Sequence, residues 1–416
     1  MTTKRWLGSA YSVNDLWTVS LSGTVISQTY TMMINSKSVT YTAGGSDTVT
    51  IILSALAAAW NASTIVEFTE ATATALPAGG PYTSMTITGD TAGNPLTISV
   101  STGGGATFSI AHTTSATGPN DFTNGQNWSG GSAPANSDTL VFDNGSANCS
   151  FNINSSLTGI TMLVNPGYSG KIGLPQINVN GQTSYNEYRT TNLTLAGGTV
   201  TINCPTLQQC NLAFGSNTST VRVLSTGARL NTYIPVVLIT GGNGSSELDV
   251  SKGDVGIAFY QDQTANFPTI KTGYIASVQT DAVVTCGAGS TLGTIVKNGG
   301  VMTVSANSTT ITQDIGGGTL TLTDSVTVTT LNVYAGTVAM NTSGTVGTVN
   351  LYGSATLTLD GDPRGKTITN PINVYSPSVS VTDTAKTVNS GIMSLAMNGV
   401  PSCNFFHGGN SSIVIT

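Results

Sequence analysis

Short runs of alternating apolar and polar residues recur at a fixed step in residues 291–361. Gly300, Gly318 and Gly336 each open such a run and lie 18 residues apart, and Ser354 keeps the same step. Three of the repeats also contain an earlier strand-like run, at 293–297, 330–334 and 348–352. Two short strands with a glycine turn, repeated at a fixed period, are typical of one rung of a stacked solenoid.

A rung of this size cannot bury its apolar face alone, so neighbouring rungs must cover it. We therefore predict a parallel β-helix and assign residues 146–416 to it, with the 18-residue period clearest at 291–361. Within the repeat we expect Val301, Leu320 and Val338 to point into the rod.

The remainder of the predicted rod is less regular than this repeat. From Cys149 onward the strand-like runs are short, and longer excursions occur at 178–189 and 260–272. Such excursions can form the contact surface of a solenoid. Closing strands are expected at 373–382 and 412–416, and an open end needs a cap or a partner because its strand edges are unpaired.

The N-terminal part of the chain carries a different pattern and predicts a separate domain of residues 1–115. Strands are expected at 17–21, 29–34, 39–42, 66–72, 85–88 and 96–100. Asp47 is the predicted helix N-cap, because its carboxylate can accept from free amides of the first turn. After it, one apolar stripe continues for about three helical turns: Val49, Ile52, Leu53, Leu56, Ala57 and Trp60. We expect a small sheet with this helix packed across it, and Trp60 in the core.

Composition and charge agree with this architecture and argue against two functions. Only 8% of the 416 residues are charged, so the predicted outer faces consist mainly of hydroxyl and amide side chains between β-branched residues. A formal net charge of −6 argues against nucleic-acid binding, which needs a basic surface to displace phosphate counterions. No apolar run approaches the roughly 20 residues that a membrane-spanning helix requires.

Residues 7–16 contain several polar side chains and do not form the apolar core of a secretory signal. We therefore expect the chain to be made and kept in the cytoplasm of its host. The cysteines are odd in number and lack C-x-x-C spacing, which predicts buried apolar residues and neither a metal site nor a disulfide framework. They are Cys149, Cys204, Cys210, Cys286 and Cys403.

Residues 360–367 come close to a phosphate-binding loop. The motif needs glycine where Asp360 stands and a helix after the lysine, whereas the residues from Thr367 onward are strand-like. Asp360 and Asp362 could hold calcium together with backbone carbonyls, but two carboxylates are few for that ion. A charged turn between rungs is the preferred interpretation, and we assign no metal and no cofactor.

Candidate catalytic side chains are sparse. His112 and His407 lie near no nucleophile elbow. A polysaccharide hydrolase or lyase on the β-helix stays open as an alternative, because two carboxylates at working distance are the minimum for hydrolysis. The candidates are Asp249, Asp254, Asp262 and Asp281. Because Asp is also common in turns, we assign no catalytic residue and expect a protein that is not an enzyme.

Several stretches resemble known protein segments. Residues 127–131, Asn-Trp-Ser-Gly-Gly, with Pro134 and the strand-like 138–143, are similar to segments that lead into β-helices of bacterial surface and autotransporter-type proteins. They lie in a predicted linker, residues 116–145. The module at 17–110 resembles a Thr-Ile-Asn-Gly-type β/α domain of tailed-phage structural proteins. Together with 172–175 and 185–189, the layout resembles uncharacterised virion proteins of tailed bacteriophages.

This resemblance implies a structural component of a phage virion and transfers no catalytic residue. We expect a head decoration or cement protein on the outer capsid surface, forming a homotrimer. Its module would dock on the major capsid protein or another virion protein while the rod projects outward. Trp6, Tyr11 and Trp17 are candidate contacts with the shell or a sister chain, or are buried in the module. A tail fibre or spike, or a bacterial adhesin that binds a glycan receptor, stays open as an alternative.

Overall fold

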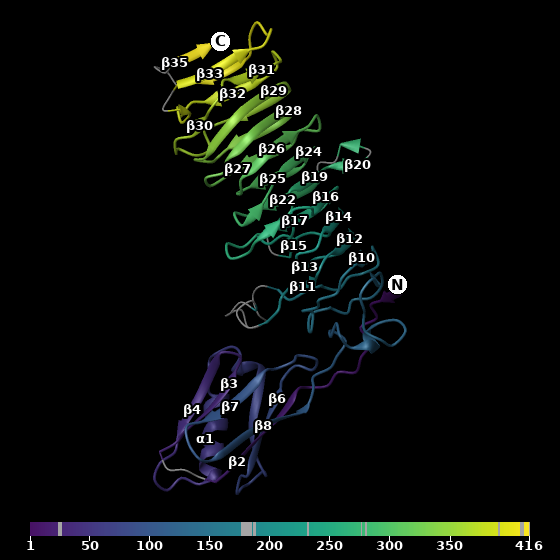
Figure 1. Ribbon diagram of the computed structural model, residues 1–416, viewed down its shortest axis with the longest axis vertical. Coiled ribbons are helices and arrows are strands. Elements are labelled where there is room, and N and C mark those ends of the chain that lie inside the picture. Colours follow the sequence, from purple (N-terminus) through teal and green to yellow (C-terminus); the bar gives the residue numbers. More distant parts are fainter. Residues whose placement is uncertain are drawn as a thin grey trace.

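The structure is a computed structural model that describes residues 1–23, 27–175, 185, 189–230, 233–275, 277–278, 281–389, 392–407 and 412–415. A small β/α module lies beyond one end of a long parallel β-solenoid (Figure 1). The predicted mainly-β architecture is confirmed. Most of the predicted excursion at 178–189 lies outside the described residues.

Parallel strands form two long sheets along the rod. In stacking order, the first sheet contains β1 (Thr3–Arg5), β9 (Thr139–Phe142), β10 (Ile160–Val164), β12 (Gly198–Asn203), β14 (Ser219–Ser225), β16 (Glu247–Val250), β19 (Thr269–Thr272), β24 (Thr294–Lys297), β26 (Ser308–Gln313), the first parts of β28 (Val328–Met340) and β29 (Thr345–Thr358), β31 (Ile372–Val374), β33 (Ile392–Met397) and β35 (Ser412–Ile415).

The second sheet contains β11 (Leu193–Leu195), β13 (Cys210–Phe214), β15 (Val237–Gly242), β17 (Gly253–Ile257), β22 (Ala282–Cys286), β25 (Val301–Val304), β27 (Thr319–Leu322), the second parts of β28 and β29, β32 (Ser380–Asp383) and β34 (Asn404–His407). Three short strands pair beside these sheets: β18 (Ala265–Asn266), β23 (Ser290–Thr291) and β30 (Thr367–Ile368). A hairpin of β20 (Tyr274–Ile275) and β21 (Ser277–Val278) projects from the rod (Figure 1).

Alternate residues of each strand point into the rod and stack on their equivalents in the next rung. Met302, Leu320 and Val338 pair in register and are fully buried, which confirms two of the three predicted interior positions. Val301 pairs with Thr319 and is 46% exposed, so the prediction for Val301 is wrong. The strand alternates one residue out of phase with that prediction, and Met302 occupies the interior position.

The predicted step of 18 residues holds for successive rungs of the second sheet from Val283 to Thr337, where Val283 pairs with Val301. Val301 pairs with Thr319, and Thr319 pairs with Thr337. The prediction that Ser354 keeps the step is wrong, because Ser354 pairs with Ala335 after a shift in register. The extra residue is accommodated where a β-bulge interrupts the ladder between β28 and β29.

Polar ladders follow the outward face of the last rungs of the first sheet. The amide of Asn350 donates to Asn332 Oδ1 at 2.8 Å, and that of Asn373 donates to Asn350 Oδ1 at 2.9 Å. Beside them three aromatic rings stack with centroids 4.5 and 4.7 Å apart, those of Tyr334, Tyr352 and Tyr375. In each ladder a side chain contacts its equivalent on the next rung, so both ladders connect rungs on the outer face of the rod.

An aromatic cluster closes the N-terminal end of the rod. The rings of Trp6 and Trp128 meet edge to face with centroids 5.0 Å apart, and Phe142 lies 5.7 Å from Trp128. Phe122 and Tyr168 extend the cluster. All five rings belong to the core of the rod, and edge-to-face contacts of this kind favour one packing arrangement.

The predicted linker at 116–145 is therefore part of the folded rod. Asn127 is fully buried, and its amide donates to the carbonyls of Gly118 and Asp121 at 2.8 Å. The indole of Trp128 donates to the carbonyl of Phe122 at 2.7 Å. The part of this segment before β9 caps the end of the rod. Its buried polar groups are hydrogen-bonded within the turn, and its aromatic side chains cover them.

The module is built from two antiparallel sheets and not from the single sheet that was predicted. One has the order β5 (Ala71–Leu76), β6 (Ser84–Gly89), β2 (Leu16–Ser22) and β8 (Thr107–Thr114), and the other β4 (Lys37–Thr42), β3 (Thr29–Ile34) and β7 (Ile98–Thr102). A short 3-10 turn, η1 (Phe68–Glu70), precedes β5, and η2 (Gly125–Asn127) lies in the rod cap. Helix α1 (Val49–Asn61) contacts edge strands β4 and β5 of the two sheets.

Five of the six residues of the apolar stripe of α1 are buried as predicted, and Val49 is partly buried. Trp60 lies in the core with its indole donating to the carbonyl of Ala71 at 2.8 Å. The predicted N-cap is wrong: the side chain of Thr48 accepts from Ile51 N. The carboxylate of Asp47 instead accepts from the hydroxyl of Tyr41 at 2.8 Å. The two neighbouring residues are both good N-caps, and the loop geometry selects Thr48.

The chain enters and leaves the module at neighbouring points. Val13 and Thr117 form an antiparallel bridge, in which Val13 N donates to Thr117 O at 2.7 Å. Before this bridge, β1 pairs with β9 of the rod. The structure thus differs from the predicted domain 1–115: the first strand belongs to the rod, and the module is inserted between β1 and the rod cap.

We predict that the same substitution has a large effect at an interior position and little effect at an outward-facing position on the neighbouring rung. Leu320→Asp places a charge in the closed interior and is expected to lower the free energy of unfolding by at least about 3 kcal/mol. Val301→Asp, on the outer face, is expected to change it by about 0.5 kcal/mol or less. Denaturant unfolding measures both, and equal losses would contradict the interior register.

Two polar side chains lie inside the rod among the apolar columns. Lys297 and Gln313 are fully buried and pair in register on neighbouring rungs. The Lys297 ammonium donates to the carbonyl of Gly317 at 2.6 Å, and the Gln313 amide donates to that of Ala335 at 2.7 Å. Burial lowers the pKa of Lys297 to about 8, because the protonated form loses its hydration.

The depressed pKa of Lys297 predicts a pH-dependent cost. Below pH 8 both states carry the proton, and burying the charge costs on the order of 3 kcal/mol. Above that pH the folded state loses the proton first, so the cost declines as pH approaches the unfolded value near 10.4. Lys297→Met should therefore stabilise the protein most at pH 7 and less at pH 10, relative to the parent.

Thiols and tyrosines titrate in both proteins and cancel in this difference. Lys252→Met is the matched control, because the Lys252 side chain is 48% exposed. A difference between parent and Lys297→Met that does not vary with pH would contradict the buried ammonium.

Candidate interaction site at the junction of module and rod

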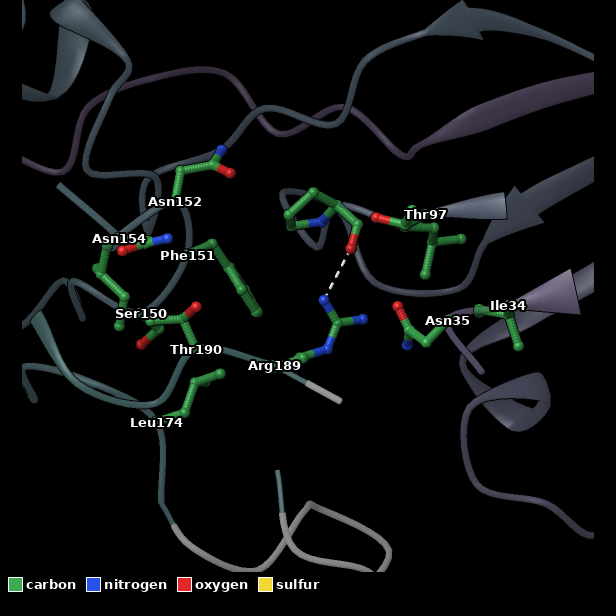
Figure 2. A pocket seen from close by; sticks show the side chains of 13 residues that line it. Ile34, Asn35, Thr97, Ser150, Phe151, Asn152, Asn154, Leu174, Arg189 and Thr190 are labelled. Carbon is green, nitrogen blue, oxygen red and sulfur yellow. Dashed lines mark hydrogen bonds between the residues drawn. The ribbon is translucent and has the colours of Figure 1, made fainter. Parts of the chain in front are cut away.

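A pocket of about 240 Å³ lies where the module meets the rod (Figure 2). The module contributes Ile34, Asn35 and residues 95–97 from the ends of β3 and β7. The rod contributes residues 150–154 of the first turns, Leu174, Arg189 and Thr190. Backbone and side-chain polar groups from both bodies face this pocket.

Arg189 joins the two bodies across the pocket. Its Nη1 donates to the carbonyl of Pro95 at 2.7 Å, as Figure 2 shows, and its Nη2 pairs with the carboxylate of Glu70. The two side chains are 11% and 8% exposed. The guanidinium also lies 5.9 Å from the ring centroid of Phe151. A nearly buried ion pair of this kind fixes the orientation of the module on the rod.

A second polar centre holds the base of the module. The buried carboxylate of Asp15 accepts from Ala116 N at 2.8 Å and from Leu96 N at 2.9 Å. It also bonds the ring of His112 and the indole of Trp17, each at 2.8 Å. Asp15 therefore ties three segments together where the chain passes between module and rod.

His112 is part of this centre and lies on β8. Its ring stacks on Trp17 with centroids 4.0 Å apart. None of the strands expected from the sequence includes His112, but Phe108 and Ile110 alternate with polar residues and give β8. His407 ends β34, whose backbone pairs with β32 far along the rod. The two histidines therefore belong to distant elements.

The N-terminal aromatics differ in exposure. Trp6 is buried in the rod cap, Trp17 is partly buried against His112, and Tyr11 is 83% exposed. Of these three, Tyr11 therefore offers the most accessible aromatic surface, close to the bridge at Val13. The expectation that any of them contacts a shell or a sister chain stays a prediction.

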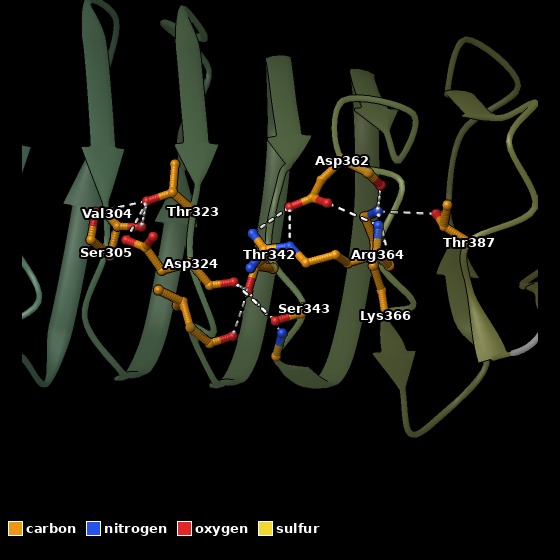
Figure 3. A network of polar contacts seen from close by, with 12 residues as sticks. Val304, Ser305, Thr323, Asp324, Thr342, Ser343, Asp362, Arg364, Lys366 and Thr387 are labelled. Carbon is orange, nitrogen blue, oxygen red and sulfur yellow. Dashed lines mark hydrogen bonds and ion pairs between the residues drawn. The ribbon is translucent and has the colours of Figure 1, made fainter.

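The charged turn at 360–367 takes part in a polar network along one edge of the rod (Figure 3). Hydrogen bonds from Arg364, through its side chain and its backbone N, lower the pKa of Asp362 to about 2. Asp360 accepts from Thr384 Oγ1 at 2.8 Å. The buried Lys366 ammonium donates to the carbonyl of Asp362 at 2.7 Å. This arrangement agrees with a charged turn between rungs.

The strand β30 follows Lys366 directly, where a phosphate-binding loop would lead into a helix. Further along the network, Ser343 N donates to the carbonyl of Asp324 at 2.8 Å, and the hydroxyls of Ser305 and Thr323 bond at 2.7 Å. Within the described residues, no group of three or more His, Cys, Asp or Glu side chains is arranged to hold a metal ion.

The four carboxylates considered for hydrolysis do not share one site. Asp254 pairs with Arg229, and Asp281 pairs with Lys252 at 2.8 Å, along an open groove of about 610 Å³. Asp262 lies on an exposed turn. Asp249 lies on the outer face of the first sheet, away from these pairs. Each of the two carboxylates that line this groove is therefore paired with a cation, and the other two lie elsewhere.

Four of the five cysteines are buried, as predicted. Burial raises the pKa of the Cys149 and Cys210 thiols well above the usual value and that of Cys286 to about 12. They remain protonated at neutral pH and act as small apolar side chains. Cys403 is partly exposed.

Comparison with protein-family models, curated proteins and solved structures finds no match for this chain. Among the parts that the structure describes, no helix has the length and apolar character that a membrane span requires.

We predict that Arg189→Ala releases the module from its fixed orientation. Removing one partner of a buried ion pair leaves the other charge uncompensated, at a cost on the order of 3–5 kcal/mol. Small-angle scattering should show a broader distribution of module positions, and the module should melt separately. Arg5→Ala is the matched control, because that side chain is 52% exposed in its pair with Asp143 and exposed pairs contribute about 0–1 kcal/mol. Identical scattering from both variants would contradict the proposed coupling.

Proposed function

We propose that this protein is a structural component of a tailed-phage virion, most specifically a head decoration protein that projects from the capsid. The observation that carries the proposal is the placement of the module. It is a compact domain inserted at one end of a rod and fixed there by Arg189 and Asp15. Such a chain has a docking end and a projecting end.

The work of such a rod is mechanical. Ladder hydrogen bonds and stacked apolar columns join each rung to the next, so the rod resists bending along its length. Only 8% of the residues are charged, so little of this stability is screened by salt. The resemblance of the N-terminal module and of the segment at 127–131 to phage and surface-protein segments points to the same role.

A homotrimer with the module nearest the shell completes the proposal. Exposed sheet edges with few charges associate unless they are covered, and identical copies around a closed axis cover them symmetrically. The docking partner would be the major capsid protein or another virion protein. A tail fibre or spike, or a glycan-binding adhesin, uses the same rod with a different partner at the module.

Excising the module tests the docking assignment. Because Val13 and Thr117 are bridged, residues 14–116 can be replaced by a short glycine linker that keeps β1 and Trp6 in the rod. The shortened protein should unfold cooperatively as the parent rod does, yet lose binding to emptied phage heads in a sedimentation assay. The parent protein with Tyr233→Ser, an exposed change on the rod, is the control.

Undiminished head binding by the excised protein would refute the docking role of the module. Sedimentation equilibrium of the parent protein tests the assembly independently. A trimer mass is expected, and a monodisperse monomer would refute the trimer while leaving the docking result to stand.

A further inference from the structure

One arginine of the chain stands apart from the others. The sequence contains five arginines, and four have ion pairs: Arg5 with Asp143, Arg189 with Glu70, Arg229 with Asp254 and Arg364 with Asp362. Arg222 is exposed on the outer face of β14 and has no ion pair with a described carboxylate. In a protein with so few charges, an unmatched guanidinium indicates a role outside the fold.

Arg222 belongs to a column of three charged residues on successive rungs. It pairs in register with Asp249, and Asp249 pairs with Lys271. Strands of a sheet lie about 4.8 Å apart, so the carboxylate is flanked by one cation on each side. Neither the Arg222 guanidinium nor the Lys271 ammonium lies within ion-pair distance of the Asp249 carboxylate.

Asp249 is only partly exposed, and its Oδ1 is buried without a hydrogen-bond partner in the described structure. Burial raises the pKa of its carboxyl even though Arg222 and Lys271 act to lower it. A buried acceptor without a hydrogen-bond partner is an unfavourable arrangement for a surface that contributes only to stability.

These residues line a depression of about 70 Å³ on the outer face of the rod. Its polar side chains come from three strands: Thr220 and Arg222 of β14, Glu247 and Asp249 of β16, and Thr269 and Lys271 of β19. The site therefore presents two cations, two carboxylates and two hydroxyls on rigid strands.

We propose that the Arg222–Asp249–Lys271 column binds the sugar-acid residues of an acidic polysaccharide. The ligand carboxylate lies on the Arg222 guanidinium, since Arg binds carboxylates through two parallel hydrogen bonds, and the Lys271 ammonium, two strands away, donates to a ring hydroxyl. Ring hydroxyls donate to Asp249 and to the flanking threonines. A compact dianion such as phosphate is disfavoured, because the two carboxylates of the site repel it. The ligand must therefore combine one negative charge with hydroxyl donors on one ring.

This inference goes beyond the proposed virion role, which needs no small ligand. Titration calorimetry of the full-length protein with a galacturonate trimer tests it, with a neutral galactose trimer for comparison. Arg222→Gln and Asp249→Asn should each weaken galacturonate binding at least about tenfold, the loss of a charge-assisted hydrogen bond. Lys252→Gln, an exposed lysine elsewhere on the rod, should change it less than about twofold.

Three results would overturn the inference. One is no measurable galacturonate binding, and another is equal binding by the parent and Arg222→Gln. The third is tighter binding of galacturonate and inorganic phosphate by Asp249→Asn, which would mean that the site attracts anions alone. Because the substitutions lie on an outer strand face, circular dichroism of each variant should match the parent. Head binding should be unchanged in all of them, so this test is separate from that of the virion role.

Discussion

The structure depends on the axial register of its parallel strands. No rung encloses a core by itself, so each apolar side chain is buried only if the next rung places its equivalent directly above. The column through Met302, Leu320 and Val338 shows this dependence. The same constraint explains the aromatic cap, because the first rung has no preceding rung and Trp6 and Trp128 cover it instead. It also explains why the Asn and Tyr ladders form outside, where identical side chains meet at every step.

Sequence periodicity predicted the solenoid and the buried face of α1, because both depend on local spacing. It gave the wrong phase at Val301, since Val301 and Met302 are both apolar and alternation alone could not choose between them. The sequence did not predict strand β1, because Thr3–Arg5 has no apolar residue and its partner β9 lies more than a hundred positions away. Pairing at that distance leaves no local pattern.

The candidate sites were less accessible to sequence reasoning than the fold. Glu70 and Arg189 are separated by 119 positions, and nothing in either neighbourhood indicates the other. Arg222, Asp249 and Lys271 follow rungs of 27 and 22 residues, so their alignment follows no fixed period. One signal was present in the sequence, because a chain with few charges offers few carboxylates that could pair with each arginine. Only the fold shows which carboxylate each arginine meets.

The rod includes β1, and the module is an insertion between this first strand and the cap. Hydrogen exchange with mass-spectrometric detection tests this claim most directly. Trp6 N donates to Val141 O at 2.9 Å, and Thr139 N donates to Thr2 O at 2.9 Å. We predict that the amides at residues 4–6 are as protected from exchange as those of β9 and β10. Rapid exchange at residues 4–6, with β9 and β10 still protected, would contradict it.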